Sequence, residues 1–281
     1  HWAWFWRSLR AYENPILWMI KFLGRIFSPK QWVSGWVEDA PYRAKRLRAI
    51  IAISDMVKQD MMRWYQIPEE RIHVVYNGVD IERFHPRNRR HREEIRRRHG
   101  IGDEFVILFV SNNFRMKGLA FLIKALAEIK KENSLPLKLL VLGRDRQNSY
   151  LGLARDMGIF EEVIFAGSTH EPEKYYGASD LLVHPTFYDA CSLAVLEALA
   201  SGLPVVTTAS NGASGILCHG EEGWVIGDLK NGEELRKGIA YFFDEKRRRQ
   251  ATCRAREKAE TYSEKANFDR MITIFNEAMQ R

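Results

Sequence analysis

Residues 190–220, with the sequence ACSLAVLEALASGLPVVTTASNGASGILCHG, carry a single formal charge, on Glu197, when His219 is counted as neutral. A carboxylate within so apolar a predicted helix costs several kcal/mol unless a partner hydrogen-bonds it. Asp189 precedes Glu197 by eight residues and lies in the turn after the apolar strand LLVHP (181–185). The order of strand, acidic turn and helix with a buried acid predicts a ligand site at the end of a parallel sheet.

The rest of the chain alternates apolar strands with helices. Strands without polar alternation are predicted at 105–111, 137–143, 163–167, 181–185, 203–208 and 223–228, with helices between them. Such runs indicate an α/β fold whose parallel sheet is covered on both faces. Upstream, residues 1–47 are predicted to be helical, residues 48–54 and 73–80 are predicted strands, and Ser54 is predicted to cap a helix that runs to Tyr65.

Composition sets the bounds of function. The chain has 281 residues, 46% of them hydrophobic, which excludes a disordered protein. Its net charge of +7 favours anionic partners such as nucleotides, acidic lipid surfaces or nucleic acid. Three cysteines without CxxC spacing fit a reducing compartment rather than a disulfide or metal framework. No apolar run approaches the roughly 20 residues of a membrane-spanning helix.

Three loops follow predicted strands, at 111–118, 143–148 and 184–193, and the carboxyl ends of parallel strands share one edge of the sheet. Lys117 lies where a helix begins, with Arg115 two residues earlier. Together these cations could hold a diphosphate; the alternative is two solvated surface cations. Arg144, in the second loop, either contacts a base or is simply exposed.

The acids and amides of the third loop have structural alternatives as well. Asp189 could cap the following helix. The amides near Ser192 and Leu193 would point out of the helix start, where they could donate hydrogen bonds to phosphate oxygens. For Glu197 we favour the diol of a sugar as partner, since no arginine or lysine lies nearby in sequence. Gly167 and Ser168 begin a further loop on this edge, where Ser168 could instead cap the helix after it.

Other patterns point to no further chemistry. The basic run at 83–99 is interpreted as a solvated helix face, with nucleic-acid or membrane contact as the lesser alternative. The histidines show no HExxH-type spacing, so no metal site is predicted. The chain also lacks GxGxxG after a strand, a Walker A loop, a GxSxG elbow and the acidic DxD of a metal-bound nucleotide sugar.

Three segments carry a family resemblance: VVYNGVDIERFHP (74–86), VSNNFRMKGLAFLIKAL (110–126) and HPTFYDACSLAVLEALASGLPVVTT (184–208). Together they resemble the nucleotide-sugar half of retaining GT-B glycosyltransferases of family 4, and within it the lipopolysaccharide-core glucosyltransferase type. The resemblance extends over about residues 48–245. It implies a remnant of an N-terminal acceptor-side domain at 1–74 that lacks its start, a complete Rossmann-like donor domain at 75–245, and C-terminal helices at 246–281 that cross back.

The resemblance also implies roles for residues. The E-x7-E pattern of the family is present as Asp189, which would contact the transferred sugar, and Glu197, which would hold the nucleotide ribose. The amides of Ser192, Leu193 and Ala194 would hold the phosphate and the sugar. The diphosphate lysine of the family matches Lys117.

Two departures from the family pattern stand out. The diphosphate arginine of the family is Asn112 here, and Arg115 is placed to substitute for it. Aspartate in place of glutamate at Asp189 shortens the reach by one methylene group, which bears on the choice of donor.

Six of the eight tryptophans lie within the first 36 residues. Among three explanations, the first in rank is that they are core residues left exposed because the opening strands of the first domain are missing from this chain. The others are packing on the second domain and contact with a membrane interface, where tryptophan and basic residues suit the headgroup region.

We therefore expect a metal-independent retaining hexosyltransferase without a cofactor, which transfers a hexose from UDP-glucose or a related nucleotide sugar. The expected acceptor is a cell-envelope glycan or a lipid-linked acceptor such as the lipopolysaccharide core. The expected location is the cytoplasm, at the inner face of the cytoplasmic membrane if the anionic lipid surface is a partner; no nucleic-acid partner is expected. The alternative is a truncated module that binds a nucleotide sugar without transferring it.

Overall fold

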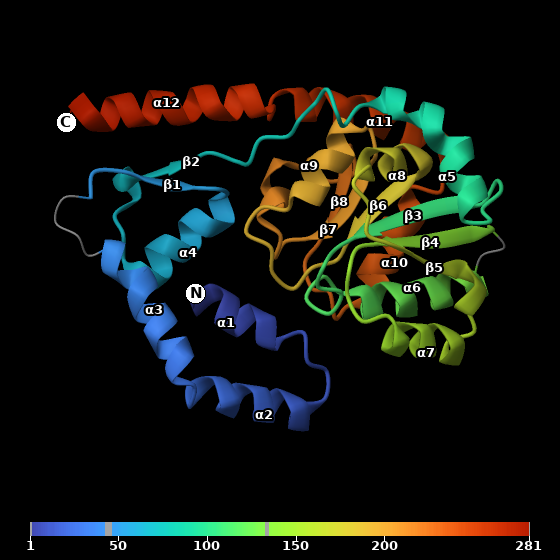
Figure 1. The fold of residues 1–281 in the computed structure, drawn as a ribbon, viewed down its shortest axis with the longest axis horizontal. Helices are drawn as coiled ribbons and strands as arrows, with labels where there is room; N and C mark the ends of the chain where they lie inside the picture. Colours follow the sequence, from blue (N-terminus) through green and yellow to red (C-terminus); the bar gives the residue numbers. More distant parts are fainter. Residues whose placement is uncertain (1, 43–46, 133–134, 281) are drawn as a thin grey trace.

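The computed structural model describes residues 2–42, 47–132 and 135–280. It contains a two-stranded sheet and a six-stranded sheet (Figure 1). The larger sheet has the order β5-β4-β3-β6-β7-β8, and each neighbouring pair is parallel, as predicted. Its strands are β3 (Phe105–Val110), β4 (Leu137–Leu142), β5 (Val163–Gly167), β6 (Leu181–His184), β7 (Val205–Thr208) and β8 (Gly223–Ile226).

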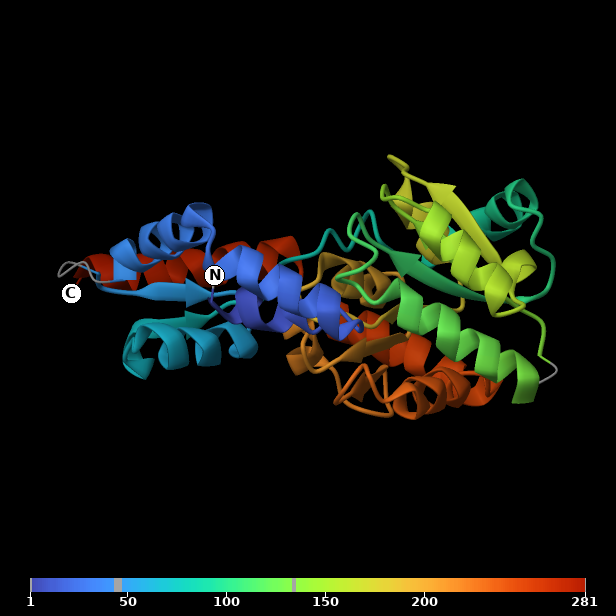
Figure 2. The same ribbon diagram turned by 90° about the horizontal axis from the view of Figure 1, so that it is seen from below.

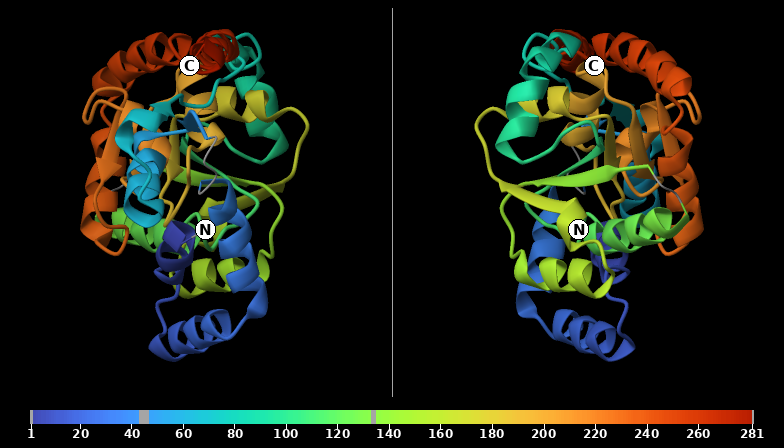
Figure 3. Two further views of the ribbon diagram at one scale, coloured as in Figure 1. Left: turned by 90° about the vertical axis from the view of Figure 1, so that its left-hand side faces the viewer. Right: turned by 90° about the vertical axis from the view of Figure 1, so that its right-hand side faces the viewer.

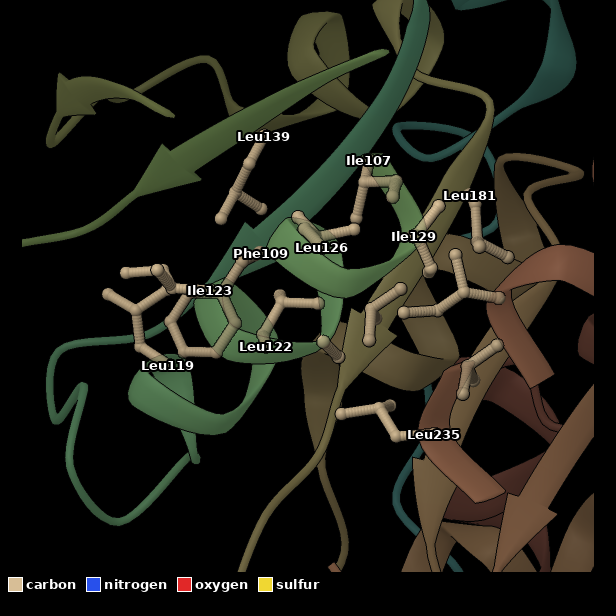
Figure 4. Close-up of a cluster of buried hydrophobic side chains, with 14 of the residues drawn as sticks. Ile107, Phe109, Leu119, Leu122, Ile123, Leu126, Ile129, Leu139, Leu181 and Leu235 are labelled. Carbon is tan, nitrogen blue, oxygen red and sulfur yellow. The ribbon is translucent and has the colours of Figure 1, made fainter. Parts of the chain in front are cut away.

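Helices cover both faces of this sheet, as the unbroken apolar strands predict. One face packs against α6 (Leu119–Glu132), α7 (Asn148–Asp156) and α10 (Gly232–Tyr241). The other packs against α5 (Arg92–Arg98), α8 (Pro172–Ala178), α9 (Leu193–Ala200) and α11 (Glu245–Glu260). Figure 4 shows the first interface, where leucines and isoleucines of α6 meet Ile107 and Phe109 of β3.

The N-terminal part is smaller. Ser54 caps α4 (Asp55–Tyr65) as predicted, since its hydroxyl accepts a hydrogen bond from the amide of Val57 at 3.2 Å. The strands β1 and β2 pair in parallel, with Ile50 opposite Ile72. The elements of this part are α1 (Trp2–Leu9), α2 (Pro15–Ile26), α3 (Pro29–Tyr42), β1 (Ile50–Ala52), α4 (Asp55–Tyr65) and β2 (Ile72–Val74). Short 3-10 helices lie at Glu69–Arg71, Pro86–His91, Phe160–Glu162 and Gly212–Ile216.

The last helix, α12 (Glu264–Gln280), runs from the six-stranded part back over β1 and β2 (Figures 1 and 2). The guanidinium of Arg48 donates a hydrogen bond to the carbonyl of Ala278 at 3.0 Å. At the start of α12, a Cβ on Gly78 would lie 2.7 Å from the Cα of Glu264, so the two chain segments touch without room for a side chain. The two sheets are thereby joined both by the segment after β2 and by α12.

Tryptophans of the N-terminal helices are largely exposed. Trp4, Trp6, Trp18, Trp32 and Trp36 are between 36% and 72% exposed, and the choice among the three explanations stays a prediction. No residue of α2 is buried, and this helix projects at the bottom of both views in Figure 3. Membrane contact stays a prediction. Among the described ranges, no helix is both long and apolar enough to cross a bilayer.

The basic run at 83–99 is also not simply a solvated face. Asp180, at the start of β6, accepts a hydrogen bond from Arg92 and another from Arg96, each at 2.8 Å. Its carboxylate accepts a third hydrogen bond from the amide of Val106 at 2.9 Å. Arg96 and Asp180 are both buried, so these two arginines tie α5 to the first residues of β3 and β6.

Asp180→Asn tests this buried contact. Removing one partner leaves buried guanidinium charges uncompensated, so we expect the free energy of unfolding to fall by about 3–5 kcal/mol, measured by urea denaturation. Glu94→Gln is the matched control, because Glu94 pairs with Arg98 on the surface and should change stability by about 1 kcal/mol at most. Equal, small losses in both variants would show that the Asp180 cluster does not stabilise the fold.

Candidate functional site

The six-stranded sheet has one point where the chain reverses its direction of travel. From β3 it proceeds outward to β4 and β5, and it then returns to place β6 on the other side of β3. The loops that leave β3 and β6 therefore diverge from neighbouring carboxyl ends, which is where open α/β sheets bind ligands. These are two of the three loops that the sequence selects (Figure 1).

Gly118 brings these two loops together. Its φ of +75° lies in the left-handed region, and a Cβ at this position would stand 2.1 Å from the carbonyl oxygen of Pro185. The amide of Phe187 also donates to the carbonyl of Met116 at 2.9 Å. The loop after β3 is thus held directly against the loop after β6.

This contact places a cation beside an acid. The ammonium of Lys117 lies 2.5 Å from Oδ2 of Asp189 and 3.2 Å from the carbonyl oxygen of Tyr188. Nε2 of His184 lies 3.5 Å from the same carboxylate oxygen and 3.3 Å from the hydroxyl of Ser192. The structure therefore joins Lys117 and Asp189, predicted from separate loops, and adds a histidine behind them.

The electrostatics of this group favour an ionised acid next to a neutral imidazole. Burial acts to raise the pKa of Asp189, but the neighbouring His184 and the charge of Lys117 outweigh it and hold that pKa well below its usual range. Burial lowers the pKa of His184, so its ring is neutral at pH 7. Nδ1 of this ring is buried and has no hydrogen-bond partner among the described residues.

Asp189 and Ser168 do not cap the helices that follow them. The N-cap of α9 is Ser192, and the N-cap of α8 is Glu171. The structural alternatives considered for Asp189 and Ser168 are therefore wrong, and both side chains remain on the edge of the sheet.

The start of α9 offers fewer free amides than the sequence suggests. Oδ1 of Asn211 accepts a hydrogen bond from the amide of Ser192 at 3.3 Å. Leu193 and Ala194 lie in the first turn of α9, whose amides have no intrahelical acceptor. Leu193 is 51% exposed, so the first turn of α9 reaches the surface.

Glu197 is mostly buried, and its partner is a tyrosine. The hydroxyl of Tyr176 donates to Oε2 of Glu197 at 2.7 Å. Burial raises the pKa of Glu197, partly opposed by this hydrogen bond and by the charge of Arg83. Arg83 itself forms a salt bridge with Glu173 at 3.0 Å. Within the described ranges, Glu197 has no salt bridge of its own. A second oxygen of the carboxylate is left for a ligand hydroxyl.

The remaining predicted residues fall into two groups. The amide of Arg144 donates to Oδ1 of Asn112 at 2.8 Å, and its guanidinium donates to the hydroxyl of Ser168 at 3.2 Å. The carbonyl of Gly167 accepts from the amide of Gly143 at 2.7 Å, which joins the loops after β4 and β5. Asn112 thus supports a neighbouring loop at the position where the family pattern has an arginine.

Arg115 forms the other group. Its guanidinium lies 4.5 Å from the ring centroid of Tyr12, an arrangement typical of a cation–π contact. Lys117 is instead directed to Asp189. Because the two cations have different partners in this structure, their joint grip on a diphosphate stays a prediction.

Sequence reasoning missed three residues that shape the site: His184, Tyr176 and Asn211. Each carries a polar group into a mainly apolar segment, and their side chains are buried. A buried polar group needs a hydrogen-bond partner. The histidine in LLVHP and the tyrosine pair at 175–176 indicate that such partners exist, but the sequence does not identify them.

The one group of side chains in the described ranges that could hold a metal ion lies elsewhere. Among the described residues, ligand atoms of Cys218, Glu221 and Glu222 lie within 4.8 Å of one another. The ammonium of Lys258 lies 3.6 Å from Glu222 and 3.4 Å from the sulfur of Cys218. This lysine already compensates the group's negative charge.

Comparison with known proteins agrees with this geometry. Residues 91–261 match the family described as "Glycosyl transferases group 1", and residues 1–83 match "Glycosyltransferase Family 4". An uncharacterized glycosyltransferase of Methanocaldococcus jannaschii is 31% identical over 68% of this chain and 49% of its own length. The lipopolysaccharide glucosyltransferase WaaG of Escherichia coli is 28% identical over 70% of this chain and 54% of its own length.

Solved structures show the same fold. The crystal structure of WaaG, a glycosyltransferase involved in lipopolysaccharide biosynthesis, superposes with a TM-score of 0.76 at 26% identity, covering 88% of this chain and 68% of that one. Anabaena HepE in complex with UDP and glucose gives a TM-score of 0.69 at 21% identity, over 81% and 62% of the two chains.

These matches show an α/β fold of GT-B type, which confirms the predicted fold class. The chain belongs to the family Glycosyl transferases group 1. It spans about half the length of the two curated relatives named above.

Glu197→Gln tests the predicted ribose contact. The amide keeps the shape of the side chain but removes its charge, so we expect binding of UDP-glucose to weaken by about 1–3 kcal/mol, measured by calorimetry. Circular dichroism should show an intact fold. Glu173→Gln is the matched control, since this acid pairs with Arg83 rather than with Tyr176. Unchanged affinity in Glu197→Gln would refute the ribose role.

Proposed function

We propose that this chain forms the donor-binding half of a retaining glycosyltransferase. The enzyme transfers a hexose from a nucleoside diphosphate sugar, UDP-glucose or a close relative, to a cell-envelope glycan or lipid-linked acceptor such as the lipopolysaccharide core. Because the chain spans about half the length of the curated relatives it matches, the activity is proposed for the whole protein.

One observation carries the proposal. At the reversal point of the sheet, a cation from the loop after β3 meets an ionised acid from the loop after β6. The helix α9 follows this acid in the chain, with open amides in its first turn and Glu197 near its centre. Positive charge, open amides and a shielded carboxylate in this order suit a diphosphate flanked by a hexose on one side and a ribose on the other.

Each residue has a distinct role in the proposed reaction. Lys117, with Arg115, stabilises the negative charge that develops on the diphosphate as the bond between the sugar C1 and the phosphate oxygen breaks. Asp189 orients the hexose through its hydroxyl groups, and Glu197 anchors the ribose. The leaving phosphate takes the proton of the acceptor hydroxyl, which forms the new bond to C1 on the same face.

The proposed donor and acceptor are suggested by what similar proteins bind or are named for. HepE was crystallised in complex with UDP and glucose, and WaaG is named as a lipopolysaccharide glucosyltransferase. Metal independence is proposed because Lys117 and Arg115 supply the positive charge that a metal supplies elsewhere, and because the loops contain no DxD motif.

The alternative is a module that binds the donor without turnover, which Asn112 at the usual arginine position favours. Incubation with UDP-glucose, with and without lipopolysaccharide-core acceptors and with EDTA, separates the two. Release of UDP in the presence of EDTA supports the metal-independent enzyme. Binding of UDP-glucose without any release of UDP would support the module instead.

Lys117→Ala tests the catalytic charge. We expect kcat to fall by about 10²–10³-fold while the affinity for UDP-glucose changes much less, because the charge on the diphosphate grows in the transition state. Lys131→Ala is the matched control on the surface of α6. A thermal unfolding midpoint close to that of the parent protein shows that the fold is retained. A loss of affinity with kcat unchanged would indicate uniform ground-state binding instead.

A further inference from the structure

His184, the last residue of β6, has no role in the proposed reaction, although its ring lies against the pair of Lys117 and Asp189. It is 2% exposed, and its ring stacks on that of Phe109 with 6.3 Å between the centroids. Its carbonyl oxygen accepts a hydrogen bond from the hydroxyl of Thr207 on the neighbouring strand at 2.8 Å. Because backbone and ring are both held by the sheet, the position of Nε2 is fixed.

The surroundings of the ring select one tautomer. Nε2 lies 3.5 Å from Oδ2 of Asp189 and 3.3 Å from the hydroxyl oxygen of Ser192. A lone pair on Nε2 would face an ionised carboxylate, so the proton belongs on Nε2. Nδ1 is then the unprotonated nitrogen, and it is buried without a hydrogen-bond partner among the described residues. A second proton would leave an N–H without an acceptor at Nδ1 and add a positive charge near Lys117, so the ring is a neutral donor.

Asp189 has both of its side-chain contacts on one oxygen. Oδ2 accepts from Lys117 at 2.5 Å and faces the ring of His184, while Oδ1 has no partner in the parts of the chain that the structure describes. The backbone of Asp189 is fixed, because its amide donates to the carbonyl of Ser210 at 3.1 Å and its carbonyl accepts from the amide of Gly212 at 2.7 Å. The carboxylate therefore turns only about its own side-chain bonds and stays within reach of Nε2.

The proposed reaction takes one of these two donors away. The ammonium of Lys117 turns to the diphosphate, and Asp189, whose side chain is 19% exposed, loses its charged partner. A largely buried carboxylate is destabilised when it loses a hydrogen-bond donor. Nε2 of His184 is already 3.5 Å away, and hydrogen bonds that are long in a free enzyme often shorten in its complexes. The ring thus supplies a donor that remains when the lysine leaves.

We propose that His184 is a positioning residue, which donates Nε2–H to Oδ2 of Asp189 and holds this acid in place while Lys117 moves to the diphosphate. The assignment rests on the proposed function, because the movement of Lys117 is part of it. The neutral ring preserves the charge of Asp189, so that Oδ1 accepts a hydrogen bond from a hydroxyl of the hexose. A lysine or arginine in this position would instead compete with Lys117 for the acid and repel it.

Calorimetry with UDP and with UDP-glucose on the full chain tests this role. In His184→Leu, Asp189 has no donor once Lys117 turns to the phosphates of UDP, so the affinity for UDP should fall by about tenfold. The affinity for UDP-glucose should fall by about threefold or less, because hydroxyl groups of its hexose donate to Asp189 in place of the ring. A ring that only fills space between the strands would produce no such difference between the two ligands.

His184→Gln is the conservative variant, because glutamine carries a neutral N–H donor at about the distance of Nε2 from the backbone. It should restore the affinity for UDP to within about threefold of the parent. His219→Gln is the matched control, since this exposed histidine accepts a hydrogen bond from the amide of Val225 at 3.3 Å, next to β8. It should leave both affinities unchanged. Thermal unfolding of His184→Leu shows whether the fold is retained.

The parent protein provides a second measurement that needs no leucine variant. A proton–nitrogen correlation spectrum of the histidine rings, assigned with His184→Gln, should show the proton of His184 on Nε2. This proton should move downfield when UDP binds, as the bond to Asp189 shortens. A proton on Nδ1 would overturn the assignment, as would equal losses for the two ligands, or none, in a folded His184→Leu. A parent chain that binds neither UDP nor UDP-glucose would contradict the proposed function itself.

Discussion

The ion pair between Lys117 and Asp189 is the contact on which the arrangement of the site depends. Both side chains are 19% exposed, so their charges interact more strongly than an open surface pair and cost more to separate. The low pKa of Asp189 keeps the acid ionised, and the pair closes the gap between the loops that leave β3 and β6. In the proposed reaction, a nucleotide sugar replaces both partners at once: its phosphate oxygens compensate Lys117, and its hydroxyl groups donate to Asp189. A ligand with only one of these groups leaves a charge without a partner.

The loop after β6, which contains Asp189, is also held by contacts from the N-terminal part of the chain. The hydroxyl of Ser54 donates to the carbonyl of Ala190 at 2.7 Å, and the side-chain amide of Asn77 donates to the carbonyl of Cys191 at 3.0 Å. Gly212 packs so closely that a Cβ there would stand 1.8 Å from the carbonyl oxygen of Ala190. The cap of α4 therefore also sets the position of the loop that contains Asp189. A shift of the N-terminal elements would therefore move the acid relative to Lys117.

Much of this fold follows from local sequence patterns. Unbroken apolar runs such as 105–111 and 137–143 predict buried parallel strands. Ser54 predicts the start of α4, because a capping side chain bonds an amide only two or three residues further along the chain. The shared edge of Lys117 and Asp189 follows from the rule that ligands bind beyond the carboxyl ends of strands. Their direct ion pair does not, because it joins residues 72 positions apart through the backbone contact at Gly118.

The features that the sequence did not predict all depend on tertiary packing. Asp180 compensates Arg92 and Arg96 from 84 or more residues away, so the basic run alone resembles a solvated face. Tyr176 reaches Glu197 only because α8 and α9 cover the same face of the sheet.

A crystal structure of this chain with UDP-glucose tests the central claim most directly. The account predicts that diphosphate oxygens replace Asp189 as the partner of the Lys117 ammonium, and that ribose hydroxyls lie within hydrogen-bond distance of the Glu197 carboxylate. A nucleotide bound away from the loops after β3 and β6, with the pair of Lys117 and Asp189 intact and Glu197 bonded to Tyr176 alone, would contradict it.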